Sequence, residues 1–258
     1  MSKYIFAIPS YKRPDNQAAM KWLNSLGFTR ADIVVGTQTR TDYEEYKRLH
    51  GENARITFRP GNCIADNKNA LLDVCAGYRV VMLSDAVKRI CRLAPSGRTV
   101  PIESKSELLM IIDRNFRIAQ QEGAALWGLY PVCNAFFMDN TYTVNNLIMG
   151  CCMGFFEDNT MRFRREFRVK EDWEISLRAI DCGQRVVRFN DAAFDRRHKI
   201  KGGCHDMWKA QGDAVNARAC RMLLKEHPNL CKPHATRQNE IRYTGDKVVK
   251  PIDRKNKA

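Results

Sequence analysis

Short apolar runs alternate with amphipathic segments over the first 85 residues, and this alternation most limits the possible folds. The apolar runs have the length of buried strands and cover residues 4–8, 32–36, 55–58 and 80–83. Segments with helical spacing of apolar side chains separate them, at residues 15–26, 41–51 and 66–76. Strands that alternate with helices in this order form parallel sheets with right-handed crossovers, so we expect an α/β fold.

Capping patterns locate two helix starts. Ser104 and Glu107 have the spacing of a capping box and open a predicted helix that ends at Glu122. Thr41 and Glu44 repeat that spacing at the start of the second predicted helix. The same criteria predict further helices over 171–182 and 207–226, and strands over 125–129, 135–138, 147–156 and 185–189.

Domain organisation follows from the absence of repeats and linkers in the sequence. We expect one domain over residues 1–230, followed by a basic, partly flexible tail over residues 231–258. No apolar run approaches the roughly 20 residues of a membrane helix. The apolar part of residues 1–9 is too short for a signal peptide, so we expect a cytoplasmic protein.

The net charge indicates the class of partner, and the cysteines bear on redox state and zinc binding. The 43 Lys and Arg outnumber the 29 Asp and Glu and give a net charge of +14, which favours a polyanionic partner such as nucleic acid or a phosphorylated ligand. The ten cysteines include no C-x-x-C pair, which indicates reduced thiols. Cys and His are densest over residues 198–234, but their spacings match no standard zinc-ligand pair, and a zinc site is left open.

A basic segment is the candidate for contact with nucleic acid. Aromatic residues Phe163 and Phe167 are interleaved there with four arginines: Arg162, Arg164, Arg165 and Arg168. Aromatic rings can stack on bases while guanidinium groups bind phosphates. The alternative is a pair of core phenylalanines, four residues apart, beneath a solvated charged face.

The fourth apolar run ends at a carboxylate, Asp85, in the sequence Ser84-Asp85-Ala86. In open α/β sheets, ligands bind beyond the carboxyl ends of the strands. A carboxylate at this position can hold a divalent cation against a phosphate. The alternative is an aspartate that only caps a turn or helix after a core strand.

The order of these segments resembles that of the GT-A fold glycosyltransferases, which transfer sugars from nucleotide-sugar donors. The glycine-led segment 61–70 carries Lys68-Asn69 on a predicted helix, and a strand that ends at Asp85 follows. The resemblance covers about residues 4–189 and implies a GT-A-like, Rossmann-like α/β fold with a mostly parallel central sheet flanked by helices. It also implies a transferase assisted by Mn²⁺ or Mg²⁺.

Ala86 departs from the family pattern, in which the last aspartate of the motif is usually the direct metal ligand. Two explanations are open. One is an aspartate replaced to block turnover, so that this chain is an impaired enzyme. The other is an enzyme that manages the phosphates with Asp85 and basic residues alone. The first is preferred because Ser-Asp-Asp-Val would complete the pattern.

The resemblance also assigns roles to residues. Asp172, or else Glu171, is expected to be the catalytic base that deprotonates the acceptor hydroxyl, although an acidic pair at a helix N-terminus also stabilises the helix dipole. The implied metal ligands are Asp85, His198 and His205. The implied donor-binding residues are Pro9, Ser10, Tyr11, Arg13, Asn67, Lys68, Asn69, Ser84, Asp85, Ala86, Lys199 and Lys201. For Tyr11 and Arg13, the alternative is ordinary loop surface.

The acceptor is inferred from charge. A small, basic GT-A-like protein looks like the phage DNA-hypermodifying glycosyltransferases, so the expected acceptor is a hydroxymethylated pyrimidine in duplex DNA, inside the host cell. The alternatives are a glycosyltransferase acting on a cell-surface glycan or lipid-linked precursor, a nucleotidyltransferase, and a catalytically dead DNA-binding module. The sugar, the nucleotide, the stereochemical course and the oligomeric state stay open.

Overall fold

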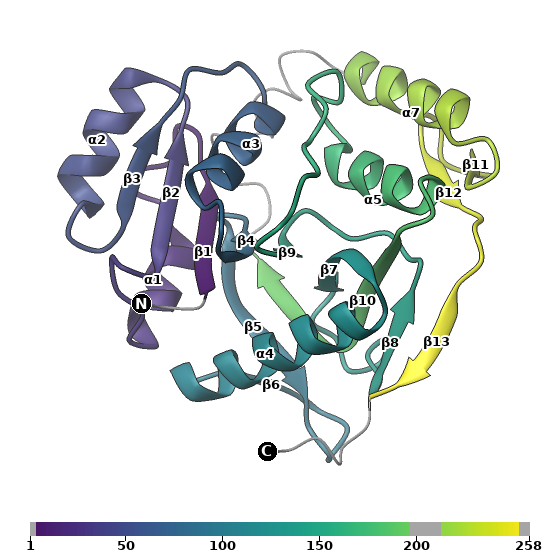
Figure 1. The fold of residues 1–258 in the computed structure, drawn as a ribbon, viewed down its shortest axis with the longest axis horizontal. Coiled ribbons are helices and arrows are strands. Elements are labelled where there is room, and N and C mark those ends of the chain that lie inside the picture. The colour runs from purple at the N-terminus through teal and green to yellow at the C-terminus, as the bar shows by residue number, and fades with distance from the viewer. Residues whose placement is uncertain (1–3, 197–212, 253–258) are drawn as a thin grey trace.

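A computed structural model of the chain describes residues 4–196 and 213–252. Its main sheet has eleven strands within these ranges, in the order β13-β8-β10-β7-β9-β4-β1-β2-β3, with β5 paired to β10 and β6 paired to β5 (Figure 1). The strands of this sheet are β1 Tyr4–Pro9, β2 Ile33–Thr37, β3 Arg55–Phe58, β4 Arg79–Leu83, β5 Val87–Leu93, β6 Thr99–Pro101, β7 Ala124–Tyr130, β8 Thr141–Val144, β9 Cys152–Phe155, β10 Arg185–Arg196 and β13 Val248–Pro251. The helices are α1 Ala18–Ser25, α2 Arg40–His50, α3 Ile64–Val74, α4 Lys105–Gln121, α5 Glu171–Asp181 and α7 Ala214–Glu226.

The N-terminal half of the sheet is parallel. Strand β1 pairs in parallel with β2 and β4, and β2 pairs in parallel with β3. The four predicted strands and their connecting helices are therefore confirmed, and so is the α/β fold class. Strand β9 is antiparallel to both β4 and β7, which makes β7 parallel to β4 and brings its carboxyl end to the same edge of the sheet.

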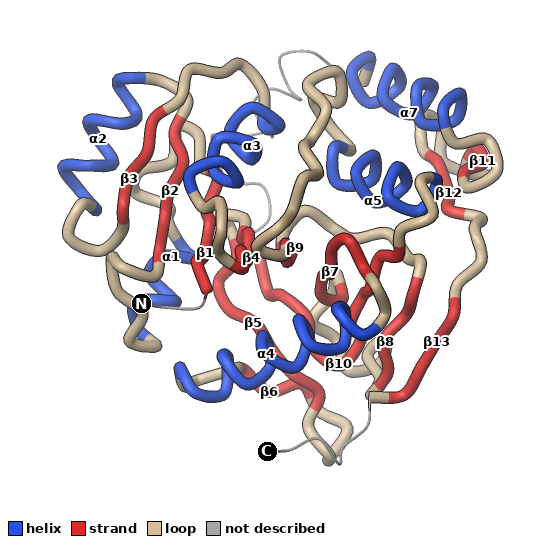
Figure 2. Tube along the Cα trace, viewed as in Figure 1, coloured by secondary structure: helices blue, strands red, loops and turns tan. Residues whose placement is uncertain are grey.

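Alternate residues of the central strands face two separate cores. In β1, Tyr4, Phe6 and Ile8 pack with α1 and α4, while Ile5 and Ala7 pack with α3 and α5. This is the period of two expected for a strand buried on both faces, and it explains why these strands read as continuous apolar runs. The helices consequently cover both faces of the sheet (Figure 2).

Both helices with a predicted capping box have a side-chain cap, but the cap of α2 lies two residues before the predicted one. The side chain of Ser104 accepts a hydrogen bond from the backbone N–H of Glu107, which confirms the predicted cap of α4. Helix α2 is capped by Thr39, whose side chain accepts from the backbone N–H of Asp42. The prediction of Thr41 as the cap is wrong, because two overlapping patterns of the same spacing begin at residues 39 and 41 and the helix starts at the earlier one.

Several predictions in the second half are wrong. Residues 135–138 form a turn and a loop instead of a strand, and only Met138 of this apolar run is buried, while Phe136 is 83% exposed. The strand predicted over 147–156 is reduced to β9, because residues 147–151 form a loop. Strand β10 extends beyond the predicted end at residue 189 to Arg196, and its added length pairs with β5.

The C-terminal segment contributes to the fold. Strands β11, Cys231–Pro233, and β12, Ile241–Tyr243, form a hairpin, and β13 adds to the edge of the main sheet beside β8. The ammonium of Lys250 lies 2.8 Å from both carboxylate oxygens of Glu122. The tail predicted at 231–258 thus includes paired strands, while its status as a unit separate from residues 1–230 stays a prediction. Within the described ranges, no helix has both the length and the apolarity required to cross a bilayer.

Candidate active site

A pocket of about 610 Å³ opens at the edge of the sheet where β1 and β4 end. The loops after these two strands, the loop before β9, the N-terminus of α5 and the end of β10 all contribute to its lining. Ten of the predicted site residues line it: Pro9, Ser10, Tyr11, Arg13, Lys68, Ser84, Asp85, Arg168, Glu171 and Asp172. Segments from four distant parts of the sequence are therefore brought together, as the carboxyl-end rule for open sheets leads one to expect.

Asp85 lies at the buried end of this pocket and is only 4% exposed. Its Oδ2 accepts a hydrogen bond from the hydroxyl of Ser10 at 2.6 Å. Its Oδ1 forms an ion pair with Nη1 of Arg13 at 3.0 Å. Burial raises the pKa of Asp85, while the charge of Arg13 and the hydroxyl of Ser10 oppose that increase. Both carboxylate oxygens are therefore already hydrogen-bonded by the loop after β1.

A network of neutral side chains holds the loop after β1 in place. The amide of Gln17 donates to the hydroxyl of Ser10 and to the carbonyl of Arg13, both at 2.8 Å. The hydroxyl of Tyr46 lies 2.8 Å from that of Ser10 and accepts from the backbone N–H of Arg13. Helices α1 and α2 thus position the loop, because Gln17 precedes α1 and Tyr46 belongs to α2.

A buried lysine and two carboxylates form the second part of the pocket. The ammonium of Lys68, on α3, lies 2.7 Å from Oε1 of Glu171. Asp172 accepts hydrogen bonds from the backbone N–H of Gly150 at 2.7 Å and from that of Trp173 at 2.9 Å. Burial raises the pKa of Asp172, and so does the adjacent charge of Glu171. The charge of Lys68 and the two backbone hydrogen bonds oppose that increase.

Gly150 allows this close packing. A Cβ at this position would lie 2.9 Å from Nζ of Lys68 and 3.2 Å from Cβ of Asp172. The close approach of the backbone lets the Gly150 N–H reach the Asp172 carboxylate while Lys68 passes beside it.

Several pocket residues were missed by the sequence analysis. Arg196, at the end of β10, donates to the sulfur of Cys151 at 3.2 Å, and Trp173 lines the pocket beside Lys170. Lys170 is in the left-handed region with φ 60° and forms an ion pair with Glu240 at 2.8 Å. If the strand predicted over residues 185–189 had been extended to its true end, Arg196 would have been placed at the carboxyl edge of the sheet.

Three predicted donor-binding residues do not line the pocket. The amide of Asn67 donates to the carbonyl of Ser10 at 3.1 Å and to that of Gly36 at 2.9 Å, so it ties the ends of β1 and β2 together. Asn69 exchanges two hydrogen bonds with the backbone of Phe163. Ala86 is buried next to Asp85 and is not among the lining residues.

The arginines predicted to contact DNA separate into two groups. Three bind carboxylates of the chain itself: Arg162 pairs with Asp73, Arg164 with Glu226, and Arg165 with Asp66. The fourth, Arg168, is exposed and lines the pocket.

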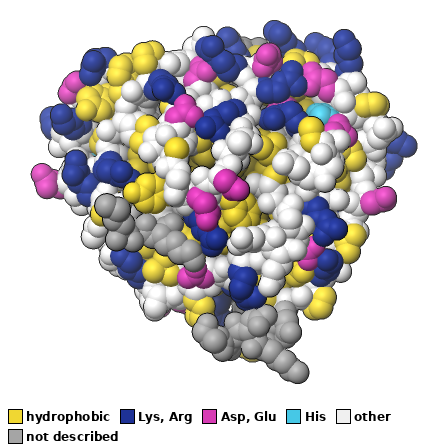
Figure 3. Space-filling model, viewed as in Figure 1, with side chains coloured by type: hydrophobic (Ala, Val, Ile, Leu, Met, Phe, Trp, Pro, Cys, Tyr) yellow, Lys and Arg dark blue, Asp and Glu magenta, His cyan; other side chains and the backbone are white. Residues whose placement is uncertain are grey.

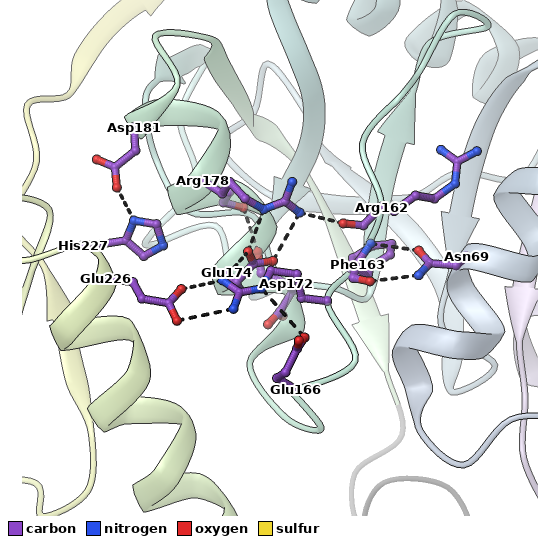
Figure 4. A network of polar contacts seen from close by, with 12 residues as sticks. Asn69, Arg162, Phe163, Glu166, Asp172, Glu174, Arg178, Asp181, Glu226 and His227 are labelled. Atoms are coloured by element: carbon purple, nitrogen blue, oxygen red, sulfur yellow. Dashed lines mark hydrogen bonds and ion pairs between the residues drawn. The ribbon is translucent and has the colours of Figure 1, made fainter.

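The surrounding polar network shows that the arginine segment has a structural role. In Figure 4, Arg178 joins the carboxylate of Glu174 to the backbone carbonyl of Arg162, and Asn69 contacts Phe163. The rings of Phe163 and Phe167 are buried, as the core alternative for this pair requires. Lys and Arg side chains on the face in Figure 3 are interspersed with Asp and Glu.

The predicted residues His198, Lys199, Lys201 and His205 lie outside the described residues. Within residues 4–196 and 213–252, no three His, Cys, Asp or Glu side chains are grouped closely enough to hold a metal ion. Of the Cys and His considered for zinc, Cys220 contacts the carbonyl of Asn239, and His227 contacts Asp181. Asp85 is the one predicted metal ligand that the described structure places in the pocket.

Comparisons with known proteins support the fold. No protein-family model and no curated protein matches the chain. Among solved structures, the chain is similar to the mannosyltransferase PcManGT from Pyrobaculum calidifontis, in complex with GDP-Man and Mn²⁺, with a TM-score of 0.52 and 13% identity over 86% of this chain and 64% of that one. A mycobacterial protein gives a TM-score of 0.50 with 10% identity over 97% of this chain and 84% of that one. A fragment of TarS from S. aureus gives 0.49 with 13% identity over 86% of this chain and 66% of that one.

At these identities the likeness concerns the fold alone. The GT-A-like fold predicted from the sequence is confirmed by the similarity to PcManGT. The chain spans less than two thirds of the length of PcManGT.

Proposed function

We propose that this chain is a nucleotide-sugar-dependent glycosyltransferase whose donor binds in the pocket at the carboxyl edge of the sheet. One observation carries the proposal: the Arg13–Asp85 pair and the Lys68–Glu171–Asp172 group line the same pocket of about 610 Å³. That volume is within the range of small-molecule sites. The similarity to PcManGT, which was solved with GDP-Man, supports a nucleotide sugar as the ligand class.

Asp172 is the proposed general base. Its carboxylate accepts two backbone hydrogen bonds and has lone pairs left for an acceptor hydroxyl, since an ionised carboxylate offers about four acceptor sites. Asp172 removes the hydroxyl proton as that oxygen bonds to the anomeric carbon, while the bond from this carbon to the diphosphate oxygen breaks and the nucleoside diphosphate leaves. Glu171 is less suited to this role, because its carboxylate is engaged by Lys68.

The donor is held by the loop after β1 and by basic side chains of the pocket. Tyr11 lines the pocket and offers a ring on which a nucleobase can stack. The predicted divalent cation fits the described residues poorly, because the guanidinium of Arg13 lies 3.0 Å from Asp85 and its charge would repel a cation there.

The proposed acceptor is a hydroxymethylated pyrimidine in duplex DNA, and its support is the net charge of +14. A glycan or lipid-linked acceptor is the alternative within the same chemistry. If the chain is instead a catalytically dead DNA-binding module, it should turn over no sugar donor with either class of acceptor.

A mass-shift assay tests the proposal. Hydroxymethylated DNA, unmodified DNA and a set of glycan acceptors are incubated with a panel of nucleotide sugars, and the products are analysed by mass spectrometry. The expected result is a sugar adduct on one acceptor and release of the nucleoside diphosphate, both lowered about 10²- to 10⁴-fold in Asp172→Asn. The control Asp73→Asn changes an exposed acid outside the pocket. Absence of product and of released diphosphate with every donor would contradict the proposal.

A further inference from the structure

The pocket carries more positive than negative charge. Within the described chain its lining includes five cationic side chains, Arg13, Lys68, Arg168, Lys170 and Arg196, and three carboxylates, Asp85, Glu171 and Asp172. Three of the cations are paired: Arg13 with Asp85, Lys68 with Glu171, and Lys170 with Glu240. Arg168 and Arg196 form no ion pair with any described residue.

Asp85 is poorly suited to hold a divalent cation in this arrangement. The guanidinium of Arg13, 3.0 Å from Oδ1, already supplies the positive charge that a metal would bring. A dication at Asp85 would meet strong repulsion from Arg13 or would have to displace it from a site where both side chains are largely buried. The hydroxyl of Ser10 donates to the other carboxylate oxygen at 2.6 Å.

Arg196 has a weak partner that a stronger acceptor can replace. Its Nη1 lies 3.2 Å from Sγ of Cys151, and sulfur is a weak hydrogen-bond acceptor. Burial raises the pKa of the Cys151 thiol, so the sulfur stays neutral and does not compensate the guanidinium charge. Exchange of this contact for a phosphate oxygen gains a charge-assisted, bidentate hydrogen bond.

Arg168 supplies the second unpaired guanidinium, from a different segment. It is exposed at the pocket, two residues before Lys170, which the structure holds in a left-handed conformation. The buried side chains of Phe167 and Val169 anchor the backbone on either side of it. Arg168 is therefore positioned by its neighbours and free to bind an anion.

From these contacts we infer that Arg168 and Arg196 clamp the diphosphate of the bound ligand, and that binding needs no divalent cation. This inference rests on the proposed function and deepens it, because it specifies how the donor's negative charge is balanced. It favours the second explanation of Ala86, in which the native enzyme uses Asp85 and basic residues alone. Asp85 then positions Arg13 and Ser10 and does not act as a metal ligand.

Titration calorimetry tests this directly. UDP, GDP, CDP, ADP and inorganic pyrophosphate are each titrated into the full chain, once with excess chelator and once with Mn²⁺. The expected result is binding of at least one nucleoside diphosphate with affinities that agree within about threefold between the two conditions, a difference below 1 kcal/mol.

Variants identify the residues responsible. We expect Arg168→Gln and Arg196→Gln each to weaken binding by roughly tenfold or more in chelator, as for loss of a charge-assisted hydrogen bond. The matched control is Arg165→Gln, in the same segment as Arg168 but paired with Asp66 outside the pocket. Arg196→Lys keeps the charge and is expected to retain more affinity than Arg196→Gln.

The outcomes are distinguishable. Binding in Mn²⁺ that disappears in chelator overturns the clamp and leaves the proposed function intact. Equal weakening by Arg165→Gln and Arg168→Gln also overturns the clamp. Absence of binding by every nucleotide and by pyrophosphate in both conditions overturns the clamp and the proposed function together.

Discussion

Arg13 and Asp85 form a largely buried ion pair with 3.0 Å between Nη1 and Oδ1, across a sequence separation of 72 residues. The pair joins the loops that follow the adjacent parallel strands β1 and β4. Because Ser10 also donates to Asp85, the carboxylate fixes two residues of the first loop at once. The shape of the pocket at this end therefore depends on Asp85.

Removal of this carboxylate is predicted to destabilise the protein. Asp85→Ala removes the carboxylate that pairs with the Arg13 guanidinium at a position that is only 11% exposed, and loss of one member of a buried pair typically costs about 3–5 kcal/mol. Urea denaturation measures the change. Asp73→Ala is the control, since that aspartate is 40% exposed and its ion pairs contribute about 1 kcal/mol or less. Similar losses in both variants would show that the pair is not a major support.

The pH dependence of transfer reports on Asp172. Burial raises the pKa of Asp172 and the charge of Glu171 raises it further, so activity is expected to fall as the pH decreases through this elevated value. Glu171→Gln removes the like charge and leaves Lys68 to stabilise the ionised Asp172. The acid limb of kcat/KM should therefore move to lower pH. An unchanged or upward-shifted limb would exclude Asp172 as the titrating base.

Gly150→Ala is predicted to impair function more than stability. The added Cβ would come within 2.9 Å of Nζ of Lys68, which is the far end of a flexible side chain that can move away. That movement weakens the contact with Glu171 and disturbs Asp172. We expect transfer to decrease by about one to two orders of magnitude. The melting temperature should change little, and a large loss of stability with normal activity would contradict this account of the site.

Glu122 is predicted to make stability depend on pH. Burial acts to raise the pKa of Glu122, but hydrogen bonds from Lys250 and Tyr142 and the charge of Arg185 lower it overall. Because the pKa of Glu122 is lower in the folded chain than in the unfolded chain, the ionised carboxylate stabilises the fold. This stabilisation is fully present above the unfolded-state pKa of about 4.3, and it is lost as the pH falls through the folded-state pKa.

Glu122→Gln should therefore reduce the free energy of unfolding by about 1–3 kcal/mol near pH 7. The difference from the native chain should shrink in acid, which urea denaturation at several pH values can measure. Glu44→Gln, at a 60% exposed side chain, is the control and should have almost no effect. A stability difference between Glu122→Gln and the native chain that grows in acid would contradict the prediction.

The parallel half of the sheet could be predicted because three of its four strands, β1, β2 and β4, are almost entirely buried. Ile5, Phe6 and Ala7 are all apolar for this reason, and the helices between the strands carry separate amphipathic patterns. Strand β5 was missed because Lys88 and Arg89 are exposed and interrupt its apolar pattern. Strand β8 is four residues long and two of them are threonines, so no apolar run marks it.

The charged residues of the site could be predicted from the sequence, whereas the side chains that hold them in place could not. Asp85 follows a recognisable strand, and Lys68 and Asp172 lie on recognisable helices, so the topology predicts that they meet. The contacts of Gln17 and Tyr46 with Ser10 depend on how α1 and α2 pack, which no local pattern encodes. Arg162 and Asp73 are 89 residues apart in the sequence, so their pairing could not be predicted either.

Thermal unfolding with a panel of nucleotide sugars tests the central claim, that this pocket binds an activated sugar through its diphosphate. The account predicts that at least one nucleotide sugar raises the melting temperature of the native chain, in chelator as well as in Mn²⁺, and that Arg196→Gln loses most of this shift while Arg165→Gln keeps it. No shift with any nucleotide sugar in either condition, or an equal shift in Arg196→Gln, would contradict it.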